Sequence, residues 1–84
     1  MSLEVFEKLS PREQNVLIKL MRGATAKQIC DQDCVSLPTV RSQIHSIISK
    51  LGVSTQLGAV VLAYQTGWPP AENGNGWREE RSAV

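Results

Sequence analysis

The sequence has no long hydrophobic run and no recognisable export signal. A membrane-spanning helix needs about 20 consecutive apolar residues, and no stretch of this chain comes close to that length. A secretory signal would place a basic segment before a short apolar one near the N-terminus, and that pattern is missing. We therefore expect a cytoplasmic protein that has no membrane partner.

Aromatic residues are scarce, with one Phe, one Tyr and two Trp in 84 residues. Aliphatic side chains must therefore supply most of the buried surface. Hydrophobic residues make up 42% of the chain, which is enough for one small core. Cores of this size leave a margin of only about 3–5 kcal/mol, so we expect a single domain.

Two cysteines and one histidine are too few for a zinc site. Cys30 and Cys34 stand four residues apart on one expected helix, where a disulfide would be strained. We expect both to be free, buried thiols that act as small hydrophobic residues. The chain also lacks a Gly-rich phosphate-binding loop and a nucleophile placed near its histidine. The sequence thus predicts neither an enzyme nor a cofactor, metal or small-molecule site.

Carboxylates are missing from a long central stretch of the chain. The net charge is only +1, which by itself argues against a strongly basic nucleic-acid binder. However, no Asp or Glu occurs between Cys34 and Ala71, whereas Arg41 and Lys50 both lie in that interval. The field of this part of the protein is therefore expected to be modestly positive.

The acid-free stretch contains a predicted helix over residues 37–51 with two unlike faces. One face is apolar and is formed by Leu37, Val40, Ile44, Ile47, Ile48 and Leu51. The other face carries short hydroxyls, one guanidinium and one imidazole, and is formed by Pro38, Arg41, Ser42, His45, Ser46 and Ser49. A surface helix that only needs solubility usually carries Glu and Lys instead. This polar face suits close contact with an anionic surface, and the major groove of DNA is the obvious candidate.

Start and stop signals predict three more helices around this one. Capping residues that begin helices are found at Ser10, Thr25, Ser36 and Ser54 or Thr55. Glycines that end helices follow at Gly23, Gly52 and Gly67. In the last helix, Leu57, Val60 and Tyr64 are expected to point inward.

The chain is thus predicted to be an all-α, four-helix bundle that contains a helix-turn-helix and has a flexible C-terminal tail. The expected limits are a lead-in over residues 1–8, the domain over 9–67 and the tail over 68–84. Two prolines, an Asn-Gly repeat and mixed charges give the tail no periodicity. Phe6 is expected to tuck against the core, and Trp68 is expected to fold back on it.

Several short motifs sharpen this interpretation. In chain order they are Leu9-Ser-Pro-Arg-Glu before Val16-Leu17, Gly23-Ala-Thr before Lys27-Gln-Ile, Val35-Ser before Thr39-Val-Arg, Ile47 before Lys50-Leu-Gly-Val-Ser, and Ala59-Val60. In this order and spacing they resemble the LuxR-type helix-turn-helix domain, the DNA-binding effector of quorum-sensing and two-component regulators. The resemblance covers about residues 9–66. It implies that the second helix braces the DNA backbone, that the third enters the major groove, and that the fourth is the dimerisation element.

The polar face and the resemblance together suggest which residues contact double-stranded DNA. Arg41 is the best candidate to read a base, because its guanidinium can grip guanine O6 and N7, and Ser42 and His45 would share the groove. The phosphate-contacting candidates are Thr25, Lys27, Ser36, Thr39, Ser49 and Lys50. Simpler roles stay open: Thr25 and Ser36 cap helices, and Lys50 suits the negative end of a helix dipole.

The fourth helix has more apolar surface than one core needs. Gly58, Val61, Leu62 and Gln65 are the expected interface of a weak, two-fold homodimer. A glycine inside a helix costs about 1 kcal/mol against alanine unless its small size is used, and a second helix would use it. RNA polymerase is a further candidate partner of such a regulator.

Three departures from the family pattern keep a second hypothesis open. Asp33 stands where the family usually has a leucine, Leu37-Pro38 replaces two commonly polar positions, and Gln56 stands where an arginine is frequent. We expect Cys34 to share the packing role of the missing leucine. The alternative is a protein-interaction module that kept this fold and lost DNA binding.

Overall fold

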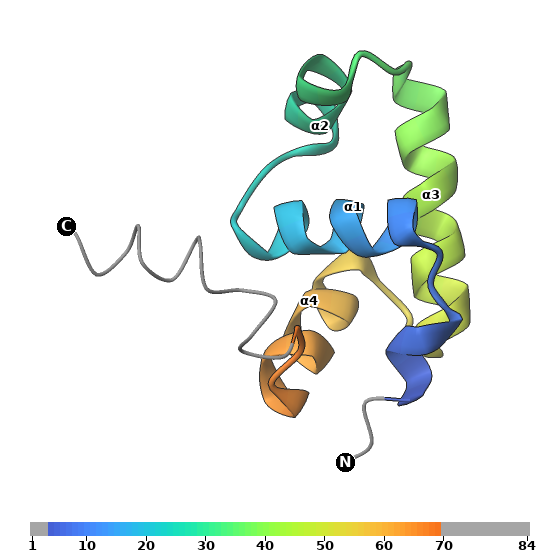
Figure 1. Cartoon of the computed structure of the whole chain (residues 1–84), viewed down its shortest axis with the longest axis vertical. Helices are drawn as coiled ribbons and strands as arrows, with labels where there is room; N and C mark the ends of the chain where they lie inside the picture. The colour runs from blue at the N-terminus through green and yellow to red at the C-terminus, as the bar shows by residue number, and fades with distance from the viewer. Residues whose placement is uncertain (1–3, 70–84) are drawn as a thin grey trace, which may run out of the picture.

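The structure, a computed structural model, describes residues 4–69, which form four α-helices preceded by a short 3₁₀ helix. In chain order these are η1 (Glu4–Lys8), α1 (Pro11–Met21), α2 (Ala26–Asp33), α3 (Leu37–Leu51) and α4 (Gln56–Thr66). No strand occurs within residues 4–69. α3 extends along one side of the molecule, with α2 near its N-terminal end, α4 near its C-terminal end and α1 between them (Figure 1). The predicted all-α fold is confirmed.

Side-chain caps determine where the helices begin. At the start of α1, the Ser10 hydroxyl accepts the Glu13 N–H at 3.1 Å, while the Glu13 carboxylate accepts the Ser10 N–H at 2.9 Å. Thr25 and Gln28 repeat this reciprocal capping box at α2. Thr55 rather than Ser54 caps α4, and its hydroxyl accepts the Gly58 N–H at 2.9 Å. These starts agree with the sequence because capping is a local interaction.

α2 ends at Asp33, and the residue that follows it, Cys34, differs from its predicted role. The C-cap of α2 is Cys34, which has a left-handed backbone (φ 57°), a conformation that side chains with a Cβ rarely adopt. Cys34 is exposed, so the expectation that it is buried and shares a packing role is wrong. Cys30 is buried as expected, and both thiols are free. The left-handed backbone of Cys34 was not apparent from the sequence pattern.

The core is formed by residues of all four α-helices, with Ile29 and Cys30 contributed by α2, and an aromatic pair packs against it. α1 and α3 supply most of its aliphatic residues, namely Val16, Leu17, Leu20, Val40, Ile44, Ile47 and Leu51. The rings of Phe6 and Trp68 stack with centroids 5.0 Å apart, and these side chains are 1% and 7% exposed. Both predictions for these aromatics are confirmed, and the packed region extends past the expected limits of 9–67 at both ends.

The rotation of α4 about its axis was predicted wrongly. The side chains it buries are Ala59 and Ala63, whereas Leu57 and Tyr64 are 70% and 54% exposed. Val60 is half-buried against the core. α4 has apolar residues of its own on every side of its axis, so its sequence does not favour one inward face over another. The small alanines let α4 approach closely and turn its larger side chains outward.

This rotation also changes the expected role of two interface candidates. A Cβ on Gly58 would lie 3.3 Å from both Thr55 Oγ1 and Val53 Cβ, so the loop before α4 already uses the small size of this glycine. Leu62 is half-buried and packs against the core. Val61 and Gln65, by contrast, are exposed. Gly58 and Leu62 therefore face their own domain rather than open solvent.

Within residues 4–69, no single helix is long and apolar enough to cross a membrane, although α3 and α4 together, bent by 54° at their junction, pass the same test of length and composition. The predicted flexible tail from residue 70 onward, including Trp77, lies outside the described residues.

Candidate nucleic-acid interface

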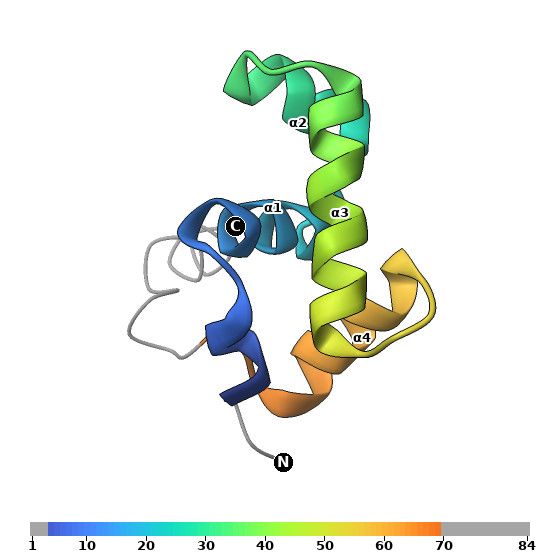
Figure 2. The ribbon, with the colours of Figure 1, turned by 90° about the vertical axis from the view of Figure 1, so that its right-hand side faces the viewer.

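The outer side of α3 is open to solvent, as the sequence predicts. Its exposed residues include Pro38, Thr39, Arg41, Ser42, His45 and Ser49. Figure 2 looks onto this side, with α2 behind the N-terminal end of α3 and α4 beside its C-terminal end. α3 itself contains no carboxylate. The apolar face predicted for this helix is buried or half-buried at every position, so the division between its two faces is confirmed except at Ser46, which is half-buried.

Two polar residues assigned by sequence to the outer side of α3 or to phosphate contact turn instead toward α1. The Lys50 ammonium donates to the Glu13 carboxylate at 2.7 Å, and Ser46 also hydrogen-bonds to that carboxylate. Burial raises the pKa of Glu13, but the hydrogen bonds from Lys50, Ser46 and the Ser10 backbone outweigh it and hold the pKa at about 2. Lys50 is thus an internal ion-pair partner in this structure, and Glu13 adds no free negative charge near the outer side of α3.

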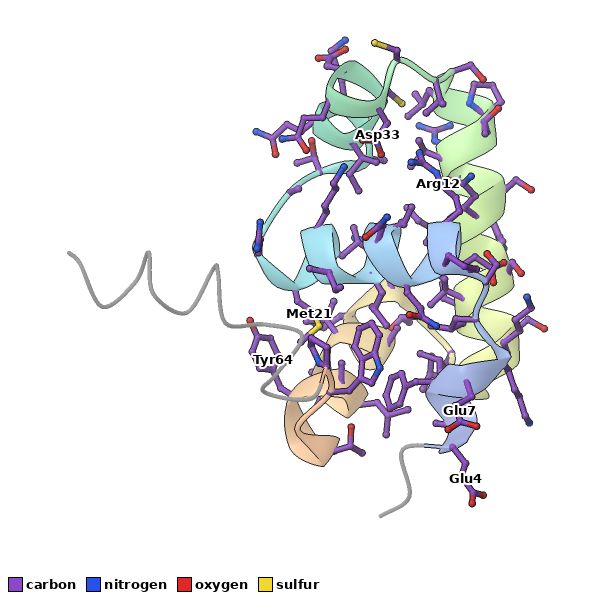
Figure 3. All side chains as sticks on the ribbon, in the orientation of Figure 1. Glu4, Glu7, Arg12, Met21, Asp33 and Tyr64 are labelled. Atoms are coloured by element: carbon purple, nitrogen blue, oxygen red, sulfur yellow. The ribbon has the colours of Figure 1, made fainter. Side chains whose placement is uncertain are left out.

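Asp33 is held by two cations of α1. Arg12 Nη1 lies 2.8 Å from one carboxylate oxygen, and Lys19 donates to the other. Figure 3 shows Arg12 and Asp33 reaching toward one another from α1 and α2. The hydrogen bond from Lys19 is the main cause of the lowered pKa of Asp33; burial opposes it, and the charges of Lys19 and Arg12 add to it. A cluster of ion pairs therefore holds the end of α2 at the position where the family usually has a leucine.

A hollow of about 400 Å³ opens beside α3, between the N-terminal ends of α2 and α4. It is lined by Ala26, Arg41, Ile44, His45, Ile48 and Gln56. Two of the predicted base-reading residues, Arg41 and His45, thus border one concave surface with an apolar floor. The sequence did not indicate Ala26 or Gln56 as neighbours of these residues, because they lie on other helices.

The phosphate-contacting candidates fall into two groups. The side-chain oxygens of Thr25 and Ser36 accept backbone N–H groups as helix caps, and the Ser36 and Thr39 hydroxyls share a hydrogen bond of 2.9 Å. Lys27 and Ser49 are exposed. Within residues 4–69, neither Lys27 nor Arg41 has an ion-pair partner. The cations available near α3 are therefore fewer than the sequence suggested.

The part of the chain that the structure describes contains no group of three or more His, Cys, Asp or Glu residues able to hold a metal ion.

Comparison with known proteins identifies the family. The family described as bacterial regulatory proteins, luxR family, matches residues 7–63. These residues include α1, α2, α3 and most of α4, and hence the whole surface described above. The chain belongs to the LuxR family. This is a DNA-binding helix-turn-helix family of transcription regulators, so the family assigned from sequence motifs is confirmed.

Relatives of this LuxR-family chain include the response regulator protein VraR of Staphylococcus aureus and of Staphylococcus epidermidis. Each is 31% identical to it over 62 residues. The aligned part is 74% of this chain but only 30% of either relative. The chain therefore spans less than a third of the length of these regulators.

Proposed function

We propose that this LuxR-family domain binds double-stranded DNA in a sequence-specific manner, with α3 in the major groove, and so regulates transcription. One observation carries the proposal: the outer side of α3 is exposed, is polar with one arginine, and has no carboxylate. Of the acids near this surface, Glu13 and Asp33 are neutralised by Lys50, Lys19 and Arg12, whereas Asp31 on α2 and Glu7 on η1 are exposed. A phosphate backbone can approach the carboxylate-free side of α3 itself without repulsion.

The ends of the neighbouring helices support the same orientation. α2 and α4 both begin beside the hollow on the flank of α3. Free N–H groups and the helix dipole make a helix N-terminus attractive to phosphate. We propose that the DNA backbone passes over these two N-termini, with Lys27 on α2 as a phosphate contact, while Arg41, Ser42 and His45 face base edges. A contact with RNA polymerase is proposed only from the resemblance to the family.

We also propose that two copies of the domain associate through α4. Leu57, Val61 and Tyr64 recur at helical spacing and form an exposed apolar stripe, with Gln65 beside it. Because α4 contains no charged residue, the same face of a second copy can pack on it without like-charge repulsion. The proposed interface therefore retains Val61 and Gln65 from the sequence-based prediction. It includes Leu57 and Tyr64 in place of Gly58 and Leu62. Such a stripe is small, so we expect a weak dimer that DNA stabilises by holding two half-sites about one helical turn apart.

The salt dependence of DNA binding tests this proposal directly. With Lys50 committed to Glu13, Lys27 and Arg41 are the cations near α3 that are free to meet phosphate or base. If Lys27 and the N-termini of α2 and α4 together neutralise about two phosphates, log affinity should fall against log salt with a slope of about −2 per protomer. The measurement is titration of a duplex pool by fluorescence anisotropy at several salt concentrations.

The interaction-module hypothesis has one observation in its favour, which is this small number of free cations. It predicts no retardation of duplex DNA even at low ionic strength, whereas the DNA-binding proposal predicts retardation that salt removes. A slope steeper than about −4 would instead show that further cations, such as Lys50, reach the backbone.

The roles of Arg41 and Lys27 can be separated by two alanine variants. Arg41→Ala should weaken binding to a selected site by about 1–3 kcal/mol and barely change non-specific binding, because a bidentate guanine contact is lost. Lys27→Ala should weaken all duplexes alike and make the salt slope shallower by about 1. Both residues are exposed, so unfolding free energies should stay within about 0.5 kcal/mol of the parent. If Arg41→Ala behaves like Lys27→Ala, then Arg41 contacts phosphate rather than a base.

A further inference from the structure

The outer side of α3 contains, at its N-terminal end, one residue that can make no hydrogen bond through its side chain. Pro38 is exposed in the first turn of the helix and has no N–H and no polar side-chain atom. At 100° per residue it lies within roughly 60° of Ser42, His45 and Ser49 around the axis. It is therefore as well placed as these polar residues to meet the floor of a groove.

The side chains next to Pro38 in the first turn of α3 are either hydrogen-bonded to one another or turned toward the core. The Ser36 and Thr39 hydroxyls are hydrogen-bonded to one another, and Ser36 also accepts the Thr39 N–H. Leu37 is half-buried and packs against the core. The first turn of α3 thus presents the rigid apolar ring of Pro38, flanked by two hydroxyls that are already hydrogen-bonded to one another, next to the hydrogen-bonding groups of the later turns.

The major groove offers one kind of apolar group on its base edges, the 5-methyl group of a pyrimidine. The other groups there are hydrogen-bond donors and acceptors, which Pro38 would remove from water without replacing the lost hydrogen bonds. We propose that Pro38 packs on the 5-methyl group of a thymine and so determines part of the sequence preference. This inference rests on the proposed function, since it requires α3 to lie in the major groove.

The position of Pro38 also limits where that thymine lies. Pro38 precedes Arg41 by three residues of α3, or roughly 4.5 Å along the axis. Successive base pairs are about 3.4 Å apart. The thymine is therefore one or two base pairs from the guanine that Arg41 grips.

The experiment first selects bound duplexes from a random pool and then replaces each thymine of the selected site, one at a time, by deoxyuridine. This exchange removes only the 5-methyl group. At one position, the parent domain should lose about fourfold in affinity, as expected for one buried methyl group. At that position, Pro38→Ser should bind the thymine and deoxyuridine duplexes equally. A cytosine placed there should bind the parent more tightly once it carries a 5-methyl group, which separates the methyl contact from other properties of thymine.

Pro11→Ala is the matched control, because Pro11 is an exposed proline at the start of α1. It should show the same sensitivity to deoxyuridine as the parent, and thermal unfolding of both variants should show that they fold. The deoxyuridine scan on the parent domain needs no variant, so a folding defect in Pro38→Ser cannot hide the answer. If selected duplexes bind but no deoxyuridine weakens them, Pro38 has no methyl contact and the proposed function stands. If no duplex binds even at low salt, the proposed function fails and the Pro38 contact fails with it.

Discussion

Val61→Glu is expected to leave the domain folded and to remove cooperative binding to a duplex with two half-sites. Val61 is 41% exposed at the centre of the apolar stripe of α4, so a charge there costs the isolated domain about 0.5 kcal/mol or less. In a dimer packed on this stripe, two carboxylates would be brought together in an apolar contact. The affinity for the two-half-site duplex should fall by about 5- to 150-fold, the usual range of a coupling free energy. Affinity for a single half-site should be nearly unchanged.

The matched control for the added charge is Asn15→Glu, which changes an exposed position on α1. It adds the same charge outside the α4 stripe and should keep cooperativity. Leu62→Glu is the opposite comparison, because Leu62 packs against the core and a carboxylate there should destabilise the fold. Sedimentation over a wide range of concentration and circular dichroism measure assembly and folding. A Val61→Glu protein that still binds both half-sites cooperatively would place the dimer contact elsewhere, and a stable Leu62→Glu protein would contradict the orientation of α4.

Glu13→Gln is expected to lower the free energy of unfolding by about 2–3 kcal/mol at pH 7. Glutamine can still accept the Ser10 N–H in the capping box, but it loses the charge that Lys50 and Ser46 bind. The size of the effect follows from the pKa of Glu13, which is lowered from 4.5 to about 2 in the folded protein. The lower free energy of unfolding of Glu13→Gln would therefore come from the lost charge rather than from a lost helix cap.

The same pKa makes the effect depend on pH. Because the folded protein favours the ionised carboxylate, this stabilisation is present in full above about pH 4.5 and is lost as the pH falls toward 2. The difference in unfolding free energy between the parent and Glu13→Gln should shrink by about 2 kcal/mol between pH 7 and pH 3. Urea unfolding of both proteins at the two pH values measures it. Taking the difference removes the contribution of Asp33, which also has a lowered pKa. An equal difference at both pH values would show that the charge of Glu13 does not stabilise the fold.

The features that the sequence predicted correctly are those determined by neighbouring residues. Both capping boxes, the glycine ends of α3 and α4 and the two faces of α3 depend on residues within one or two turns of each other. The exposed positions of Arg41, Ser42 and His45 follow from the same periodicity. Their contacts with DNA, like the dimer, stay predictions.

The features that the sequence did not predict depend on contacts between residues of different helices. Lys50 and Glu13 are 37 residues apart, and Lys19 and Asp33 are 14 apart, so neither pair appears in a local pattern. Taken alone, Lys50 is a basic residue at a helix end and Asp33 is an acid in place of a core leucine. The rotation of α4 was not predictable either, because a helix that is apolar all round gives no periodic signal. Its exposed stripe is centred on Val61, on the side of the helix away from the buried Ala59 and Ala63.

The stacked pair of Phe6 and Trp68 has a practical consequence for where this domain can be cut. The family match extends over residues 7–63, so trimming the protein to those limits removes both rings. Each ring is buried, and deleting one large buried aromatic side chain costs about 3–5 kcal/mol, as much as the whole stability of many small domains. A fragment with those boundaries should be largely unfolded in solution, whereas one that spans residues 4–69 should melt cooperatively. Failure of the shorter fragment to retard DNA would then reflect the loss of the stacked Phe6–Trp68 pair and of the fold that it stabilises. It would say nothing about the surface of α3.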